Sequence, residues 1–179
     1  MKIFAMSSPD GQLEMIPDSS LVKDGKPFFI PGLADDDCWD YMLGVAFRVS
    51  RLGKGIQKEF ATRYVDAATL CVMPRPRPTG SADILNHCFD GAIIVGNWIP
   101  VDSLPAGKPW LCKTSAGQSV EFNPMVLMAD MIEHISLWMS MKMGDIIVPV
   151  CINAAGEFKE GTLFEASLNG LSCLAFRVK

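Results

Sequence analysis

Apolar residues occupy alternate positions in several stretches of this chain, which is the spacing of strands with one buried face. In the last twenty residues, Phe164, Ala166 and Leu168 alternate with polar residues. Asn169-Gly170 then favours a type I′ turn, and a second alternating run follows it. These residues therefore predict a β-hairpin.

Other stretches rich in aromatic and β-branched residues also predict strands. They cover residues 2–6, 39–49, 67–73, 92–99, 110–113, 119–122 and 146–152. The segment from Pro74 to Gly80 holds three prolines, which predicts an extended loop because proline cannot donate to a β-ladder.

Two segments show helical periodicity instead. Residues 56–65 place Ile56, Phe60 and Tyr64 on one face. For the second helix, Asn123 is the expected N-cap with Pro124 at the first helical position, and Gly144 is the expected end. Its predicted apolar face consists of Met128, Met131, Ile132, Ile135, Trp138 and Met139. Many strands and two helices predict a sheet-rich α+β fold.

Composition narrows the class of protein. The 179 residues are 49% apolar, enough for one core, so residues 1–179 are expected to form a single domain. A net charge of −4 gives no basic footprint for nucleic acid or an anionic membrane. The apolar start is too short for a secretory signal, so we expect a cytoplasmic protein. The six cysteines include no C-x-x-C pair and are expected to be reduced.

Five short segments resemble the fumarylacetoacetate hydrolase (FAH) family, and together they span nearly the whole chain. They are Pro27-Phe28-Phe29-Ile30-Pro31, Arg48-Val49-Ser50-Arg51-Leu52-Gly53-Lys54, Phe89-Asp90-Gly91-Ala92, Asp130-Met131-Ile132 and Gly144-Asp145-Ile146-Ile147. The resemblance implies an FAH-like fold of layered strands rolled into a flattened barrel, with two helices outside. It also implies a family activity, the metal-dependent cleavage or rearrangement of C–C bonds in acylpyruvate-like or 3-keto acids.

The metal ligands that the resemblance implies are missing. The family uses Mg²⁺, Mn²⁺ or Ca²⁺, held by Glu-x-Glu on one strand and an Asp on a later one. Counting from the segment 48–54 puts the two Glu positions at Met42 and Gly44, and counting from Asp66 puts the Asp position at Met73. Thioethers and glycine are poor ligands for a hard dication, so no metal cofactor is expected. Met42 and Met73 are expected to fill the space as core; the alternative is a soft Cu(I) site that includes Cys71.

Other family positions have changed as well. His87 replaces the lysine before Phe-Asp-Gly, and Pro149 and Cys151 stand in the turn that binds the substrate carboxylate in the family. His87 and Cys151 could form a nucleophile–base pair, although an inert buried cysteine is the simpler interpretation. His134 on the second helix fits either a partner surface or a helix face without a role in chemistry.

Arginine and acidic residues also lie close in sequence to the positions of the family's site. Arg77 matches an arginine of the family pattern and, with His87, is the predicted carboxylate-binding pair. For Arg75 and Arg77 alike, a solvent-facing loop is the alternative. Replacement ligands from residues 35–37 or from Asp40 are disfavoured, because neighbouring side chains on an extended chain point to opposite sides.

The sequence therefore predicts an FAH-like protein without metal-dependent hydrolysis, which binds a small carboxylate or pairs with an active relative as a heterodimer. A homodimer is the state that the resemblance implies. The alternatives are an active hydrolase or isomerase with a relocated metal or a metal-free site, and a purely structural or regulatory subunit.

Overall fold

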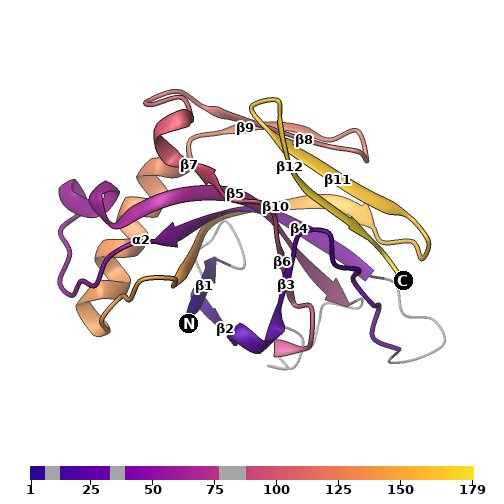
Figure 1. Ribbon diagram of the computed structural model, residues 1–179, viewed down its shortest axis with the longest axis horizontal. Helices are drawn as coiled ribbons and strands as arrows, with labels where there is room; N and C mark the ends of the chain where they lie inside the picture. The colour runs from indigo at the N-terminus through magenta and orange to yellow at the C-terminus, as the bar shows by residue number, and fades with distance from the viewer. Residues whose placement is uncertain (7–12, 33–38, 77–87) are drawn as a thin grey trace.

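Two β-sheets and one α-helix make up most of the computed structural model, which describes residues 1–6, 13–32, 39–76 and 88–179 (Figure 1). Eight strands form the larger sheet: β1 (Ile3–Met6), β2 (Leu13–Ile16), β3 (Leu21–Lys23), β4 (Trp39–Val49), β5 (Val65–Pro76), β6 (Ile93–Val95), β7 (Ile99–Pro100) and β10 (Ile146–Glu157). The smaller sheet has β8 (Trp110–Thr114), β9 (Ser119–Phe122), β11 (Leu163–Leu168) and β12 (Leu171–Arg177). The helices are α2 (Pro124–Trp138) and the 3₁₀-helices η1 (Asp18–Ser20), η2 (Lys58–Tyr64) and η3 (Val101–Ser103).

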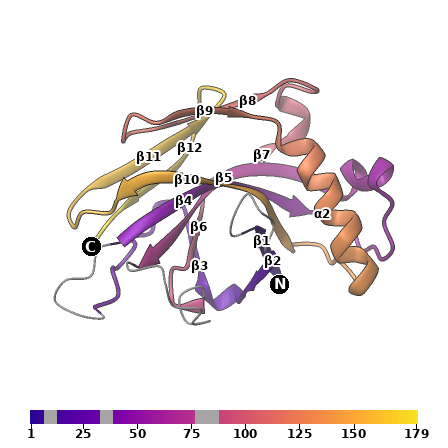
Figure 2. The ribbon, with the colours of Figure 1, turned by 180° about the vertical axis from the view of Figure 1, so that it is seen from behind.

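The larger sheet is curled. Its main strand order is β2-β1-β10-β4-β5-β6-β3, with β7 paired to β5. The two end strands, β2 and β3, are joined by η1 alone, so the ends of the sheet lie close together (Figures 1 and 2). The curl gives the sheet an inner and an outer face.

Each face of the curled sheet carries its own apolar cluster, because side chains alternate along a strand. On β4, Leu43, Val45 and Phe47 point outward, where the smaller sheet and α2 cover them. Met42 and Ala46 point inward. The inner cluster consists of Ile3, Ala5, Ile16, Met42, Ala46, Cys71, Met73, Ala92, Ile93, Val95, Ile146 and Val148.

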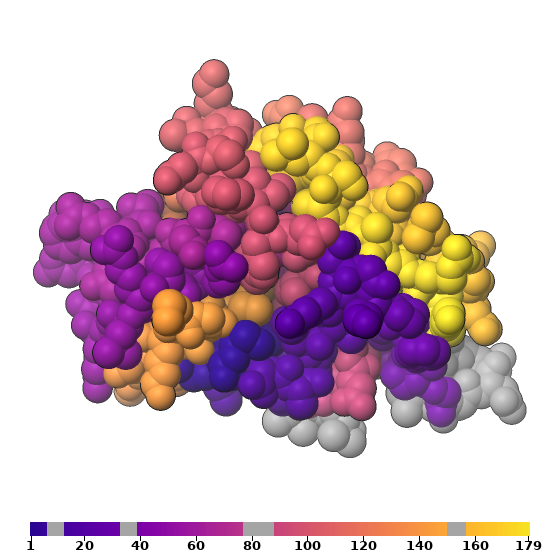
Figure 3. Space-filling model, viewed as in Figure 1, coloured from indigo at the N-terminus to yellow at the C-terminus, as the bar shows by residue number. Residues whose placement is uncertain are grey.

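The C-terminal hairpin forms as predicted. β11 and β12 are paired through Asn169 (φ 51°) and Gly170 (φ 82°), the positive φ angles of a type I′ turn. The Phe28 amide donates to the Arg177 carbonyl at 2.9 Å, and Phe28 accepts from the Lys179 amide at 2.8 Å. The segment after β3 therefore lies against the hairpin, as Figure 3 shows where indigo meets yellow.

The two predicted helices flank the sheet, and the first is a 3₁₀-helix, η2. The second is α2, where the Asn123 side chain accepts from the Met125 amide at 3.3 Å as the predicted N-cap. Gly144 does not end this helix, so that prediction is wrong. The helix ends at Trp138 because Met139 is extended and Met141 pairs with Gly53 in a β-bridge. Among the described residues, no helix has the length and apolarity of a membrane span.

The extended loop was predicted to begin at Pro74, and that start is wrong, because β5 continues to Pro76. Pro74 and Pro76 pair with Tyr41 and Trp39 of β4. On the other side of β5, β6 pairs only with Cys71 and Val72. Beyond Val72 a proline nitrogen that faces this unpaired side removes no ladder hydrogen bond, so a proline is tolerated there.

Gly96 lies at a close approach between the two sheets. Its amide donates to the Leu70 carbonyl of β5 at 3.0 Å, and the next amide, of Asn97, donates to the Cys173 carbonyl of β12 at 2.6 Å. A Cβ on Gly96 would lie 2.2 Å from the Cys173 oxygen and 2.7 Å from Thr69 Oγ1. A backbone oxygen cannot move away without separating the sheets.

We therefore expect Gly96→Ala to lower the free energy of unfolding by about 3 kcal/mol, the upper part of the range for overpacking. Urea denaturation measures this change. Gly32→Ala is the matched control, because no described atom lies within 4 Å of a Cβ at that position. Equal stability of the two variants would contradict the close approach at Gly96.

Candidate functional site

The inner face of β4 and β5 carries the three positions at which the FAH resemblance places metal ligands. Met42 on β4 is the direct cross-strand partner of Met73 on β5, and Gly44 is the partner of Cys71. Paired residues of antiparallel strands point to the same face, so the two methionines lie side by side. Met42 is 7% exposed and Met73 is fully buried. Both thioethers therefore face the interior of the curled sheet.

The part of the inner cluster that the structure describes around the methionines is apolar. Their neighbours on the inner face include Ala46, Cys71 and Val95, all of the inner cluster. Over the ranges that the structure describes, no group of three or more His, Cys, Asp or Glu side chains is arranged to hold a metal ion. The arrangement suits apolar packing.

Charged residues begin one step further along the same face. Arg75 follows Met73 by two residues, and its cross-strand partner on β4 is Asp40. Arg75 is only 6% exposed; its Nη1 donates to the Pro74 carbonyl at 3.1 Å, and its Nη2 lies 3.6 Å from Glu14 Oε2 of β2. Arg75 is therefore a buried, charge-compensated residue, and the solvent-facing alternative is wrong for it.

Glu14 was not found by sequence reasoning. It lies on β2 opposite Ala5 of the inner cluster, which places it on the inner face. The strand 13–16 has only four residues and follows a turn-rich segment. The sequence therefore shows no alternation from which this strand could be predicted. A Glu–Arg pair between the edge strand β2 and β5 therefore lies beside the apolar methionine pair.

The side chains of three predicted site residues lie outside what the structure describes. Arg77 and His87 lie outside the described residues. Cys151 lies in β10 with its Cα opposite Gly44, but its side chain is also outside what is described. The pairs His87–Cys151 and His87–Arg77 therefore stay predictions.

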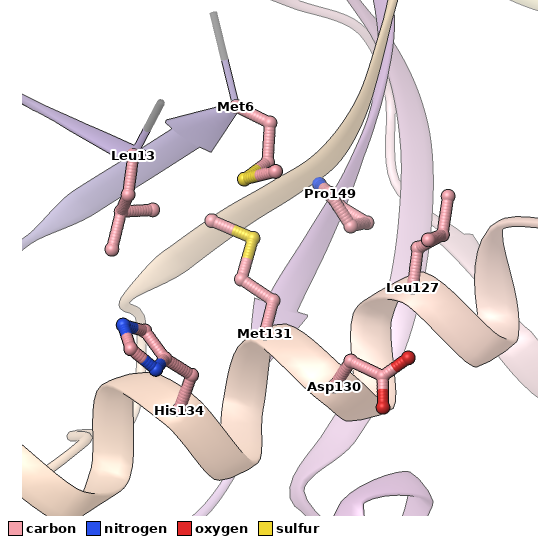
Figure 4. A pocket seen from close by; sticks show the side chains of 7 residues that line it. All are labelled: Met6, Leu13, Leu127, Asp130, Met131, His134 and Pro149. Atoms are coloured by element: carbon pink, nitrogen blue, oxygen red, sulfur yellow. The ribbon is translucent and has the colours of Figure 1, made fainter. Parts of the chain in front are cut away.

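Pro149 and His134 both line a groove on the outer face of the sheet (Figure 4). The groove has a volume of about 310 Å³ and separates α2 from β1 and β2. Its lining is mainly apolar: Met6, Leu13, Leu127, Met131 and Pro149, with the polar residues Asp130 and His134. His134 therefore faces a surface groove and not the inner face of the sheet.

Two of the described cysteines, Cys112 and Cys173, have the properties of inert thiols. Cys71, Cys112 and Cys173 are buried and unbridged, and Cys88 is half-buried. Burial raises the pKa of the Cys112 and Cys173 thiols above the ordinary value, which keeps both protonated at neutral pH. Neither Cys112 nor Cys173 therefore has the lowered pKa of a nucleophile.

Comparison with known proteins decides the family. The model for the fumarylacetoacetate hydrolase C-terminal domain matches residues 5–179. The chain belongs to the fumarylacetoacetate hydrolase family. No curated protein matches the chain.

Solved structures with the FAH fold agree. Maleylpyruvate hydrolase from Sphingobium sp. SYK-6 is similar with a TM-score of 0.82 and 19% identity, over 99% of this chain and 69% of that chain. The same enzyme with manganese(II) and pyruvate is similar with a TM-score of 0.81 and 19% identity, over 99% of this chain and 69% of that chain. The 5-carboxymethyl-2-hydroxymuconate delta-isomerase from Mycobacterium smegmatis is similar with a TM-score of 0.79 and 16% identity, over 99% of this chain and 78% of that chain. These similarities confirm the FAH-like fold.

The FAH neighbours include hydrolases and isomerases, and one of them was solved with a divalent metal. In this FAH-family chain, the positions that the resemblance assigns to the metal carry Met42, Gly44 and Met73. The described inner face therefore combines the family fold with a donor set that lacks carboxylates at these positions.

Proposed function

We propose that this protein is an FAH-family member without metal-dependent C–C bond hydrolysis. The burial of the Met42–Met73 pair carries the proposal: the two side chains are 7% and 0% exposed in an apolar cluster. A small, hard dication requires oxygen ligands, and neutral thioethers do not compete with the water that hydrates Mg²⁺. The residues present do not fit the family's metal.

Thermal unfolding during titration with Mg²⁺ and with Mn²⁺ tests this proposal. A ligand that binds only the folded state raises the melting temperature in a saturable way. We expect no saturable rise up to millimolar concentrations after treatment with EDTA. A saturable stabilising shift would contradict the proposal and favour the alternative, an active hydrolase or isomerase with a relocated metal.

We further propose that the protein retains a role in binding a small carboxylate through Arg77 and His87. Support comes from the family pattern, in which an arginine stands at the position of Arg77. Arg75 does not serve this role, because Glu14 already lies beside its guanidinium group.

Calorimetric titration with pyruvate tests the carboxylate proposal. We expect Arg77→Ala and His87→Ala each to weaken binding about tenfold, as for loss of one charge-assisted hydrogen bond. Arg51→Ala, at an exposed position, is the control. Pyruvate binding that is unchanged in both test variants, or absent in the original protein, would contradict the proposal.

Association with a second subunit is the other candidate role, either as a homodimer or with an active family member. The specific observation is the apolar outer side of α2, where Leu137 is 64% exposed and Trp138 is 77% exposed. Leu137 and Trp138 are adjacent in the sequence, and contiguous exposed apolar residues mark interaction surfaces more often than single ones do.

A further inference from the structure

A groove lies at the end of the larger sheet where β4 stops and β5 begins, beside η2 (Figure 1). We call it the η2 groove. Its volume of about 390 Å³ is in the range of small-molecule sites. Its lining includes Arg51, Lys54, Ile56, Phe60, Arg63 and Tyr64. These residues take no part in the functions proposed above.

The η2 groove is basic, although the protein as a whole has a net charge of −4. Arg51, Lys54 and Arg63 line it, and all three are exposed. Within the described part of the chain, none of the three forms an ion pair, and no acidic residue lines the groove. Three uncompensated cations around one cavity concentrate positive potential there, which attracts an anion.

Acidic residues around η2 are engaged elsewhere. Both carboxylate oxygens of Asp66 accept from Arg48, each at 2.9 Å. Glu133 of α2 accepts from the Lys58 amide at 3.0 Å. Glu59 lines a neighbouring groove together with Glu133. The cations of the η2 groove therefore keep their charge available for a ligand.

Backbone contacts fix the walls of the η2 groove. The Ser50 amide donates to the Tyr64 carbonyl at 2.8 Å, which joins the two ends of the segment that forms the groove. Gly53 and Met141 exchange two hydrogen bonds, at 3.1 and 2.8 Å. A side chain at position 53 would collide with the ring of Tyr64, so glycine lets this ring lie against the backbone. A groove whose walls are fixed in advance needs little further ordering when a ligand binds.

Aromatic rings supply the apolar part of the lining. Phe60 is 37% exposed, and the guanidinium carbon of Arg63 lies 4.8 Å from the centroid of its ring. A guanidinium group that stacks on a ring still presents its N–H edge, which suits bidentate binding of a phosphate. Tyr64 adds a second ring to the lining. The groove thus combines a phosphate-binding group with an aromatic surface.

We infer that the η2 groove binds a small phosphomonoester that carries an aromatic group. Such an ester has a charge of about −1.5 to −2 at neutral pH, which matches three cations better than a single carboxylate does. The site is separate from the inner face: Met73 lies eight residues beyond Val65 along β5, or about 26 Å at the rise of a strand. The acidic net charge and the small volume favour a small molecule over nucleic acid.

Calorimetric titration with phenyl phosphate at low ionic strength tests the inference. We expect saturable binding that Arg51→Ala and Arg63→Ala each weaken about tenfold, as for loss of one charge-assisted hydrogen-bonding group. Lys108→Ala is the matched control, because Lys108 is an exposed cation that does not line this groove. No binding at millimolar concentrations, or binding that neither arginine variant weakens, would overturn the inference.

Inorganic phosphate tests the aromatic part. We expect the original protein to bind phenyl phosphate about tenfold more tightly than inorganic phosphate, because the ring packs on Phe60. Phe60→Leu keeps an apolar side chain without the ring and should reduce this preference. Equal affinity for the two probes would overturn the aromatic assignment. A single-stranded oligonucleotide that binds more tightly than phenyl phosphate, and less tightly to Arg63→Ala, would overturn the assignment to a small molecule.

The variant Arg51→Ala separates this groove from the carboxylate site proposed above. It should weaken the binding of phenyl phosphate and leave the titration with pyruvate unchanged. Weaker pyruvate binding in Arg51→Ala would overturn the separation of the two sites. Failure of phenyl phosphate to bind would overturn the η2 groove alone, because the metal and pyruvate experiments do not depend on it.

Discussion

Met73→Asp is expected to destabilise the protein by about 3–5 kcal/mol, the range for leaving a buried charge without a partner. Met73 is fully buried, and its described neighbours in the inner cluster, Met42 and Cys71, are apolar. The nearest cation along the strand, Arg75, already has Glu14 beside it. A carboxylate at position 73 would therefore lose its hydration without gaining a counter-ion. Urea denaturation at neutral pH measures the loss.

Two controls separate charge from simple loss of the methionine. Met73→Leu conserves volume and apolar character, so we expect a loss below about 1.5 kcal/mol. Met143→Asp introduces the same charge at a position that is 78% exposed, where we expect a change within about 0.5 kcal/mol. Near-equal stability of Met73→Asp and Met143→Asp would show that water reaches position 73, contrary to the packed inner face.

The same position links stability to function. If the register inferred from the resemblance is correct, the triple variant Met42→Glu, Gly44→Glu and Met73→Asp restores the family's acidic set. We expect it to be strongly destabilised without metal and to gain melting temperature with Mg²⁺ or Mn²⁺. A triple variant that folds but shows no metal response would contradict the assigned register.

Most strands could be predicted because the alternation of apolar and polar residues is local information. The hairpin 163–177 and the long strand 39–49 were predicted in this way. The errors arise where tertiary contacts decide the outcome. Pro74 stays in a strand because, among the described strands, β6 pairs with β5 only at Cys71 and Val72, and α2 ends early because Met141 pairs with Gly53. Neither contact can be inferred from neighbouring residues.

The candidate site divides in the same way. The positions Met42, Gly44 and Met73 were found by counting from the segment 48–54 and from Asp66, and the structure pairs Met42 with Met73. The Glu14–Arg75 contact could not be predicted, because the two residues lie 61 positions apart in the sequence. Their strands, β2 and β5, are not adjacent in the sheet and come close only because the sheet curls.

Asp145 is the second residue at which a substitution is expected to lower the stability of the fold strongly, and here the loss depends on pH. It is 1% exposed and joins three segments. Its Oδ1 accepts from the Lys2 amide and its Oδ2 from the Lys142 amide, each at 2.8 Å, and Lys2 Nζ lies 2.7 Å from Oδ2. Its own carbonyl accepts from the Val49 amide at 2.8 Å. The side chain thus fixes the start of β10 against β1, beside the end of β4.

We expect Asp145→Asn to lower the free energy of unfolding by about 3 kcal/mol, because one partner of a buried, hydrogen-bonded ion pair is removed. Asp18→Asn is the control: its side chain is 56% exposed, and its pair with the N-terminal amine at 3.4 Å is a surface contact of little worth. Urea unfolding of both variants at neutral pH checks the difference. Equal losses would contradict the buried role of Asp145.

The pH dependence gives a second signature of the same carboxylate. Burial acts to raise the pKa of Asp145, but the hydrogen bonds and charge from Lys2 and the bond from the Lys142 amide outweigh it and hold the pKa below its usual value. A lowered folded-state pKa means that the stabilisation is fully present above the unfolded pKa, near about 3.9, and is lost as the pH falls through the folded pKa. The Asn variant cannot titrate there, so the gap in stability between it and the original protein should be widest at neutral pH. It should narrow as the pH falls below about 4. A gap that stays constant from neutral to acidic pH would show that the loss comes from packing and not from the charged pair.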